Sequence, residues 1–330
     1  MATLHSTARF HRNDIETLGW ELTVSNTLDP PESPCRRFLK GQGSYGTHLL
    51  AHLERRIPLK RMDRVLEVGG GYGYLMRDLL AVHPFPRVTM LDISPLLLKR
   101  QKEALRAYPS VRYVEADFLA IDARRLREFD WIILNENLGD FPTVVGLEGN
   151  VREDPDVGAG GEGGSVPARV RRLLDAYSLT TPDRTPFNFN LGAVEALEKI
   201  CRVGVPYVFL AEHSCEAAVP EPYRRWIDVR AGGNPERIAL KGHDEYTIRF
   251  SNLVAVAGHY GYEVLRGPVA DFLQLDFSPE LESILRARNV AVGERETVRH
   301  FVEDLFQYEY LLLRKRGVEF RVEAPLKSEG

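Results

Sequence analysis

A short run of one carboxylate and alternating glycines is the part of the sequence that most directly indicates chemistry. Residues 65–73 read Val-Leu-Glu-Val-Gly-Gly-Gly-Tyr-Gly, with the carboxylate at Glu67 and the alternating glycines at Gly69, Gly71 and Gly73. Glycine permits positive φ and has no Cβ, so a bound molecule can approach the main chain closely. The spacing predicts a ligand-binding bend between an apolar strand and a helix that begins near Tyr74.

A dinucleotide-binding fold and a plain turn are the two competing interpretations of this run. The dinucleotide-binding fingerprint G-x-G-x-x-G needs a third glycine where this chain has Tyr74 or Met76, so the spacing does not fit. A glycine-rich turn without any ligand remains possible, because a single short motif also occurs by chance.

Polar or ligand-contacting side chains follow each of the next three predicted strands. They are Asp92 and Ile93 after strand 87–91, Asp117 and Phe118 after strand 111–114, and Asn135, Glu136 and Asn137 after strand 131–134. Open α/β sheets bind ligands at this edge, beyond the carboxyl ends of their strands. We therefore expect these side chains to meet around one ligand.

Two of these carboxylates suit the sugar and the base of a nucleoside. Asp92 can accept hydrogen bonds from both hydroxyls of a ribose, and Asp117 can accept one from an adenine amino group while Phe118 packs beside the ring. Taken singly, Asp92 or Asp117 is better interpreted as a helix N-cap or part of a solvated loop. Their order behind the glycine bend favours ligand binding.

The elements that position these residues follow from the hydrophobic periodicity. Strands and helices alternate from residue 64 to residue 134, which indicates βαβ units and a parallel sheet. Beyond the strands already named, the pattern predicts helices at 45–57, 94–105, 191–202 and 253–260, more helix within 278–306, and strands at 207–211, 246–250, 262–265 and 308–313.

The chain divides into three parts on this interpretation. Residues 1–44 form an N-terminal extension with little periodicity, residues 45–316 form the main domain, and residues 317–330 form a charged C-terminal tail. A glycine-rich insertion near 146–168 interrupts the main domain, and its composition predicts a mobile loop. A passive linker and a lid over a substrate both remain open for that loop.

Composition narrows the class of protein. The 330 residues carry a net charge of -4, which argues against nucleic-acid binding through bulk positive charge. The three cysteines are widely spaced and no Cys or His group has zinc spacing, so we expect reduced thiols, a cytoplasmic location and no metal. No stretch has the length of a membrane span or the apolar core of a signal peptide.

Several segments together resemble the MidA-type methyltransferases that depend on S-adenosylmethionine (SAM). The matching segments are 67–80 (EVGGGYGYLMRDLL), 92–105 (DISPLLLKRQKEAL), 135–142 (NENLGDFP), 242–273 and the closing FQYEYLLLRKR. The glycine run itself is shared by the wider class I superfamily. The resemblance implies SAM as cofactor and a doubly wound, Rossmann-like α/β sheet, mostly parallel with an antiparallel last strand. Mitochondrial relatives are associated with symmetric arginine dimethylation in a subunit of respiratory complex I.

This chain departs from the family pattern in three places. The family's Asn-Glu-x-x-Asp-x-x-Pro motif has Gly139 at its aspartate position, and Asp140 follows one residue later. The glycine-rich stretch from residue 146 has no counterpart in the family pattern. The N-terminal residues align poorly, with only 43–47 similar to the family's approach to the cofactor. A shifted carboxylate could indicate a changed methyl acceptor.

The resemblance and the strand ends together suggest catalytic carboxylates. The sulfonium of SAM already activates the methyl group, so the protein mainly positions the acceptor. If that acceptor is arginine, a carboxylate can bind the planar guanidinium bidentately and pass its lost proton outward. Glu136, directly after the fourth strand, is the first candidate, and Asp140 and Glu212 are the others. For Glu136, a carboxylate that only accepts from nearby backbone amides is an equal alternative.

Histidines provide two weaker candidates. His213 follows the fifth strand and could deprotonate an oxygen acceptor, although a lone histidine is more often structural. His243 and Asp244 form a neighbouring pair that we interpret as holding a loop against the sheet.

Three functions remain open from the sequence. The first is methylation of protein arginine, the second is methylation of a small molecule at oxygen or nitrogen, and the third is a non-catalytic SAM-binding assembly factor. Glu67, Gly69, Gly71 and Asp92 predict SAM binding in all three, and none of them involves nucleic acid or a membrane.

Overall fold

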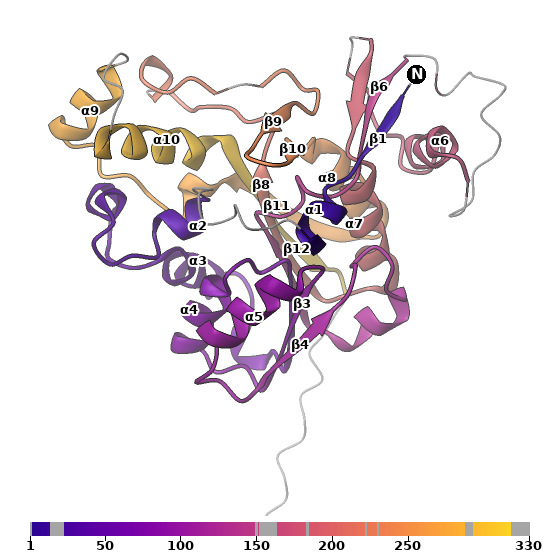
Figure 1. The fold of residues 1–330 in the computed structure, drawn as a ribbon, viewed down its shortest axis with the longest axis horizontal. Coiled ribbons are helices and arrows are strands. Elements are labelled where there is room, and N and C mark those ends of the chain that lie inside the picture. Colours follow the sequence, from indigo (N-terminus) through magenta and orange to yellow (C-terminus); the bar gives the residue numbers. More distant parts are fainter. Residues whose placement is uncertain are drawn as a thin grey trace, which may run out of the picture.

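A seven-stranded sheet forms the centre of the molecule, in the order β11-β12-β8-β5-β2-β3-β4 (Figure 1). Its strands are β2 (Arg64–Val68), β3 (Arg87–Asp92), β4 (Val111–Glu115), β5 (Trp131–Asn135), β8 (Tyr207–His213), β11 (Tyr262–Pro268) and β12 (Tyr308–Lys315). Strand β12 is antiparallel to both neighbours, and the other pairs are parallel. The predicted fold class is therefore confirmed.

The computed structural model describes residues 2–13, 23–148, 151, 164–182, 185–221, 223–229, 231–287 and 293–317. Its α-helices are α1 (Ala8–Asn13), α2 (Val24–Thr27), α3 (Tyr45–Leu53), α4 (Tyr74–Val82), α5 (Pro95–Ala104), α6 (Val166–Ala176), α7 (Leu191–Val203), α8 (Phe250–His259), α9 (Pro279–Arg286) and α10 (Glu294–Gln307). Short 3-10 helices lie at Pro34–Phe38, Leu59–Arg61, Ala123–Glu128, Tyr223–Arg225 and Val269–Asp271.

Helices cover both faces of the sheet, because successive side chains of a strand point to opposite faces. Val65 and Ile133 pack into the core that contains α3, α4 and α10. Leu66 and Ile132 pack into the core on the other face, with α7 and α8. The nearly continuous apolar runs of the central strands are what a parallel sheet buried on both faces requires.

Helix α5 begins where its sequence predicts. The Ser94 side chain accepts a hydrogen bond from Leu97 N, and Pro95 occupies the first helical turn, where a missing N–H costs nothing. This cap fixes the backbone directly after Asp92, at the end of β3.

A second sheet ties the N-terminal residues to the segment that follows β5. Strand β6 (Thr143–Leu147) pairs antiparallel with β1 (Thr3–His5) on one side and with β7 (Phe187–Phe189) on the other. Figure 1 shows β1 and β6 side by side, with α1 close to them. Residues 2–13 therefore lie at the carboxyl edge of the central sheet.

One predicted strand is wrong. Of residues 246–250, Tyr246 alone belongs to a strand, β10 (Asp244–Tyr246), which pairs with β9 (Arg237–Ala239) in a separate ribbon, and α8 begins at Phe250. The Asn190 side chain accepts a hydrogen bond from Arg249 N and donates to Thr247 O, which holds the connection between the two elements. Alternation over five residues does not distinguish a strand from such a tethered turn.

The predicted glycine-rich insertion begins and ends in regular structure. Gly146 lies in β6, and α6 begins at Val166. Residues 149–150 and 152–163, which make up most of the predicted loop, lie outside the described residues.

Two expectations from the composition concern reduced cysteines and membrane-spanning segments. Cys35, Cys201 and Cys215 are buried and form no disulfide, as expected. Within the described ranges, no helix has both the length and the apolar character that crossing a bilayer requires.

Candidate functional site

A cavity that is open to solvent lies beyond the carboxyl ends of β2, β3, β4 and β5, with about 1160 Å³ of space when its open mouth is included. The predicted residues that line it are Glu67, Gly69, Gly71, Asp92, Ile93, Asp117, Phe118, Asn135, Glu136 and Asp140. Gly73 and Glu212 are outside the lining. Residues from the N-terminal part of the chain, among them Thr7, His11 and Ser25, complete the wall. The structure therefore brings nearly all of the sequence candidates to one place.

The glycine bend between β2 and α4 has the backbone that its sequence requires. Gly69 and Gly71 have φ of 60° and 52°, in the left-handed region that side chains with a Cβ disfavour. Among the described residues, no atom lies within 4 Å of where a Cβ on Gly71 would stand, and Gly71 lines the cavity. Gly73 instead packs against Gln101 of α5 and serves the helix contact.

Two hydrogen bonds hold the Asp92 carboxylate in place and leave it able to accept further hydrogen bonds from a ligand. Its Oδ1 accepts from Ser94 N at 2.9 Å, and its Oδ2 accepts from Gln101 Nε2 at 2.9 Å. Burial raises the pKa of Asp92 to about 6, against the lowering effect of these two hydrogen bonds. A carboxylate has about four lone-pair sites. One site on each oxygen therefore remains, which fits the two hydroxyls of a ribose.

Glu67 and Asn137 each have a buried side-chain oxygen that could accept a hydrogen bond from a ligand. Among the described residues, neither Glu67 Oε2 nor Asn137 Oδ1 has a hydrogen-bond partner, although both atoms are buried. Burial, followed by the charges of Asp92 and Asp78, raises the pKa of Glu67 to about 8. Both residues line the cavity, so a donor that carries positive charge, such as the amino group of SAM, would satisfy them.

The opposite end of the cavity is suited to a flat ring. Phe118 is buried, and its ring stacks on Phe141 with centroids 6.4 Å apart. Asp117 accepts from Leu119 N at 2.9 Å through one oxygen, and Arg12 of α1 lies 3.5 Å from the other. The predicted adenine contacts are thus placed at the rim, and α1 reaches over them.

The Glu136 carboxylate accepts hydrogen bonds from the first residues of α2. Its Oε1 accepts from Val24 N at 2.7 Å, and its Oε2 accepts from the Ser25 hydroxyl at 2.5 Å and from Asn135 Nδ2 at 3.3 Å. This is the backbone-directed geometry that the sequence left as an equal alternative to catalysis. Glu136 also has a φ of 54°, which is uncommon for a residue with a side chain. Burial raises its pKa to about 7.

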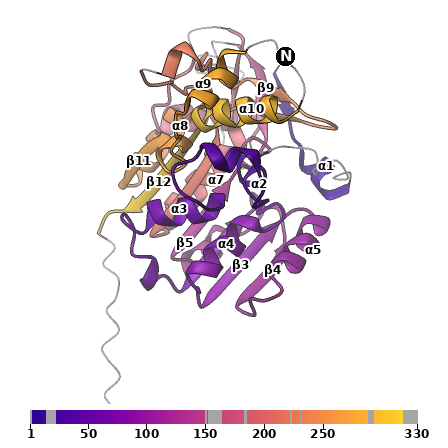
Figure 2. The ribbon, with the colours of Figure 1, turned by 90° about the vertical axis from the view of Figure 1, so that its left-hand side faces the viewer.

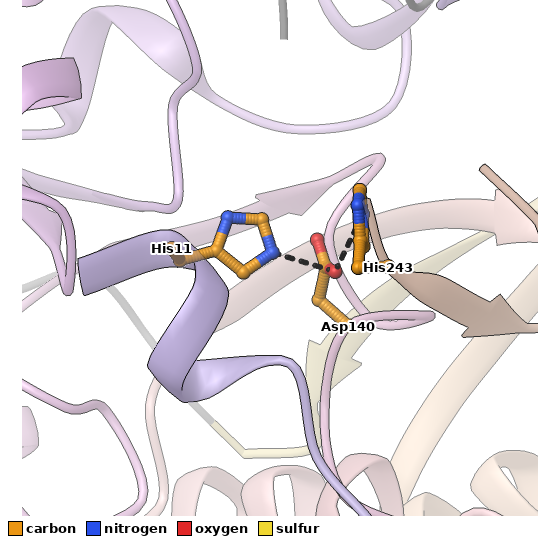
Figure 3. Close-up of side chains that lie close together, drawn as sticks. All are labelled: His11, Asp140 and His243. Carbon is orange, nitrogen blue, oxygen red and sulfur yellow. Dashed lines mark hydrogen bonds and ion pairs between the residues drawn. The ribbon is translucent and has the colours of Figure 1, made fainter. Parts of the chain in front are cut away.

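Asp140 forms a cluster with two histidines (Figure 3). His11 Nε2 lies 2.7 Å from Asp140 Oδ1, and His243 Nε2 lies 3.6 Å from the same oxygen. Burial lowers the pKa of His11, but the hydrogen bond and the charge of Asp140 outweigh it, so the net pKa is raised. Gly139 packs against the carbonyl of Tyr246, with 3.2 Å from a Cβ position to that oxygen, so a side chain there would be crowded.

Glu212 and His213 lie behind the cavity wall. Glu212 accepts from Gly139 N at 3.1 Å and from His213 N at 2.8 Å. Burial lowers the pKa of His213, but hydrogen bonds to Asp304 and Glu212 outweigh it and raise the pKa to about 10. A protonated histidine cannot act as a base, so the structure does not favour His213 as the group that deprotonates an acceptor.

The neighbouring His243 and Asp244, which we interpreted from the sequence as holding a loop against the sheet, contact different partners. Asp244 forms an ion pair with Arg237 at 2.7 Å, while His243 turns toward Asp140 and Glu245. Adjacent residues of strand-like backbone point to opposite sides, which explains why they separate.

Sequence reasoning missed two residues that build the site, His11 and Ser25. Tyr45 belongs to the 43–47 segment that resembles the family's approach to the cofactor, and its hydroxyl donates to Asn135 Oδ1 at 2.7 Å. Residues 1–44 have no periodicity that would place them at the sheet edge. Thr23 does supply a local signal, because its side chain caps α2 by accepting from Asn26 N, and a cap predicts a helix start beside Ser25.

Comparisons with known proteins agree with this geometry. Residues 66–153 match a family model described as a methyltransferase domain. The match covers β2 to β5 and the bends that line the cavity. It confirms the predicted domain type and leaves the MidA-type resemblance as a prediction.

Curated relatives match only over short segments. A ribosomal RNA small subunit methyltransferase A from Chlorobium luteolum is 42% identical over 64 residues, 19% of this chain and 22% of the relative. A protein from Dictyostelium discoideum named "Probable inactive O-methyltransferase 11" is 27% identical over 99 residues, 30% of this chain and 28% of the relative. The chain thus spans between a fifth and a third of the length of these relatives.

Solved structures match nearly the whole chain. An uncharacterised protein from Burkholderia thailandensis is 16% identical, with a TM-score of 0.51, and the match covers 93% of this chain and 91% of that one. A member of the same superfamily from the same organism, bound to S-adenosyl-homocysteine, has a TM-score of 0.50 at the same identity and coverage. Together with the domain match, the shared fold confirms the predicted SAM-dependent methyltransferase domain.

Proposed function

We propose that this protein transfers a methyl group from SAM to a nitrogen of a protein arginine side chain. The observation that carries the proposal is the cavity, which joins a cofactor half at Glu67, Gly71 and Asp92 to an acidic wall at Glu136 and Asp140. The two sets of residues line the same cavity, so a cofactor and an acceptor group bound there would lie next to each other.

The chain's own residues fit the cofactor at both ends. Asp92 keeps one acceptor site on each oxygen for a ribose, and Glu67 and Asn137 supply buried acceptors for an amino group. The open space at Gly71 lets the ligand meet the main chain. Bound SAM supplies a methyl group that its sulfonium has already activated, so the residues mainly have to bind, orient and exclude water.

The acidic wall supports a cationic acceptor. Glu136 and Asp140 line the cavity and are half-buried, and the buried Glu212 lies behind the cavity wall. Carboxylates withdrawn from water favour a cationic partner. A guanidinium is planar, stays charged and binds carboxylates through two parallel hydrogen bonds. An acceptor of this kind would offset the charge of the wall.

Glu136 is the carboxylate we assign to the acceptor. Its φ of 54° is a backbone outlier, and such strain collects at functional sites because the surrounding structure has to maintain it. Oε1 accepts only from Val24 N among the described residues, so it retains a site for a guanidinium N–H. As the methylated nitrogen gives up its proton, the same carboxylate can pass it outward.

A small-molecule acceptor is the second candidate. The observation that favours it is the closure of the cavity by residues 6–8 and 23–26 of the N-terminal part, which restricts access for a large substrate. A protein acceptor would have to enter as a single extended side chain.

Binding of SAM tests the cofactor half. In calorimetry with purified protein, Asp92→Asn should weaken SAM binding by roughly 10-fold to 100-fold, because a hydrogen bond to a charged group contributes about 1.5–3 kcal/mol. Asp122→Asn is the matched control, since Asp122 lies on the surface beside Arg124. Failure of the folded wild-type protein to bind SAM or S-adenosyl-homocysteine would overturn the proposal.

Transfer of labelled methyl groups tests the acceptor half. Incubation with labelled SAM and a cell lysate should place the label on arginine in a protein fraction. Glu136→Gln should keep its SAM affinity and lose turnover by at least about 100-fold, the usual contribution of a positioned acid or base. Label that collects in small molecules instead would select the second candidate.

A further inference from the structure

We propose that His11, Asp140 and His243 bind a divalent transition-metal ion, with Zn²⁺ as the first expectation. The three residues come from α1, from the segment after β5 and from the turn before β10. Their ligand atoms all lie within 4.8 Å of one another. Figure 3 shows the two imidazole rings approaching the same carboxylate from different directions.

The distances are close to those of a coordination sphere. Ligand atoms bonded to tetrahedral zinc at about 2.0–2.2 Å lie roughly 3.3 Å apart. His243 Nε2 is 3.6 Å from Asp140 Oδ1, and it is also 3.3 Å from Glu245 Oε1, so Glu245 lies beside the three ligands without belonging to their group. His11 Nε2 and Asp140 Oδ1 are 2.7 Å apart because they share a proton, which a metal ion would displace.

The negative charge of the carboxylates at this cluster also favours a bound cation. Among the described residues, the ion pairs of Asp140 and Glu245 are made with histidines alone. The side chains of Asp140 and Glu245 are each 19% exposed, and those of His243 and His11 are 3% and 11% exposed, so the cluster is mostly shielded from water. A divalent ion is coordinated by carboxylates and neutral imidazoles, which are the groups that Asp140, His11 and His243 supply.

Neighbouring groups orient two of the three ligands. The ring of Phe10 stacks on His243 with centroids 4.2 Å apart and planes inclined by 19°. Gly242 permits this stack, because a Cβ there would stand 2.8 Å from Phe10 Cε2. Thr7 donates its hydroxyl to the Asp140 carbonyl at 2.8 Å. Metal sites depend on such supporting contacts nearly as much as on the ligands.

The cluster lies between the main cavity and a second groove, so an ion could reach it from either side. An outer groove is lined by His5, Thr7, Phe10 and His243, and the main cavity is lined by His11 and Asp140. Two imidazoles and carboxylate oxygens suit Zn²⁺, while a set of two histidines and one carboxylate also serves Fe²⁺. A metal here would fasten the N-terminal residues to the main domain at the cavity wall.

Metal content and cobalt absorption test the site. The full-length protein is freed of metal with a chelator, loaded with Zn²⁺ or, without oxygen, with Fe²⁺, dialysed and analysed by mass spectrometry. Co²⁺ titration supplies a visible spectrum that reports coordination by nitrogen and oxygen. His11→Gln and His243→Phe each remove one ligand, and the phenyl ring preserves the stack on Phe10. His5→Gln is the matched control, because His5 lies outside the cluster.

We expect one metal ion per chain in the wild type and in His5→Gln, with a higher Tm when loaded. Affinity in His11→Gln and His243→Phe should fall by at least about 100-fold, and their Tm should no longer respond to metal. Preference for Fe²⁺ over Zn²⁺ would support the same site. The proposal is overturned if the folded wild type retains no metal, or if both variants retain as much as the wild type. SAM binding on the same samples separates this outcome from failure of the proposed function.

Discussion

At the scale of single residues, the cavity keeps its carboxylates away from water and thereby changes when they ionise. Glu67 is 1% exposed and has a pKa raised to about 8, chiefly by burial. A carboxylate that is protonated near neutral pH loses its proton more readily when a positively charged group arrives. Binding of a cationic amino group at Glu67 would therefore be coupled to release of a proton.

The pKa of Glu67 leads to a prediction about stability. The folded-state pKa of about 8 is above the ordinary value of 4.5, so folding favours the protonated form. The stabilisation from this proton is complete below pH 4.5 and is lost as the pH rises through 8. Glu67→Gln removes this titrating group. As the pH rises, the free energy of unfolding of the variant should therefore fall less steeply than that of the wild type, and the two slopes should differ by up to about 1.4 kcal/mol per pH unit.

Urea unfolding at several pH values between 6 and 8, without cofactor, measures this difference. Glu128→Gln is the control, because Glu128 is an exposed residue that pairs with Arg64 at the surface. Equal pH dependence in the wild type and Glu67→Gln would show that the buried carboxylate is ionised throughout this range.

At the scale of elements, β2, the glycine bend and α4 act as one unit that presents its main chain to the cavity. Gly71 and Gly204 make a useful comparison, because both have positive φ and neither has an atom within 4 Å of a Cβ position. Gly204 ends α7 and does not line the cavity. A Cβ at either position should therefore destabilise the backbone by a similar amount, and the two positions differ mainly in whether they line the cavity.

Gly71→Ala and Gly204→Ala should each lower the free energy of unfolding by about 1–2 kcal/mol, the usual cost of a Cβ in the left-handed region. Only Gly71→Ala should weaken SAM binding, by at least about 10-fold, because its methyl group enters the cavity. Chemical denaturation and calorimetry measure the two effects separately. Equal SAM affinity in both variants would mean that the ligand does not contact the bend.

Elements that carry strong local signals are predictable from the sequence. The apolar strands, the glycine bend and the serine-proline start of α5 all lie where the sequence predicts them, because each depends on a few neighbouring residues. The pairing of His11 with Asp140 joins residues 129 positions apart through β1 and β6, and no local pattern encodes such a contact. For the same reason the sequence does not reveal that His243 contacts Asp140.

At the scale of the whole molecule, the N-terminal residues cross the carboxyl edge of the sheet and are attached to it at several points. His11 contacts Asp140, Arg12 approaches Asp117, and the start of α2 binds Glu136. Figure 2 shows α2 above α3, apart from α1, so the contacts are spread over the edge. Access to the cavity therefore depends on how firmly these residues are held.

Gly242→Ala tests how firmly α1 is held. A Cβ at Gly242 would overlap the ring of Phe10 at 2.8 Å, and overpacking of this kind costs about 1–3 kcal/mol. Amide hydrogen exchange in residues 8–13 should become faster by roughly 10-fold or more, while exchange in β2 and β5 stays unchanged. Gly233→Ala is the control, since Gly233 also has positive φ but has no atom near its Cβ position. Equal exchange of α1 in both variants would contradict the expectation.

The direction of β12 has a practical consequence for anyone who labels this protein. Tyr308 pairs with His213 and Arg314 pairs with Tyr207, so the strand runs back from the cavity edge and ends at the far edge of the sheet. A fluorescent reporter or affinity handle joined after residue 317 would start on the side away from the ligand. The same handle joined ahead of Thr3 would start beside β6, on the side of the sheet that carries the cavity.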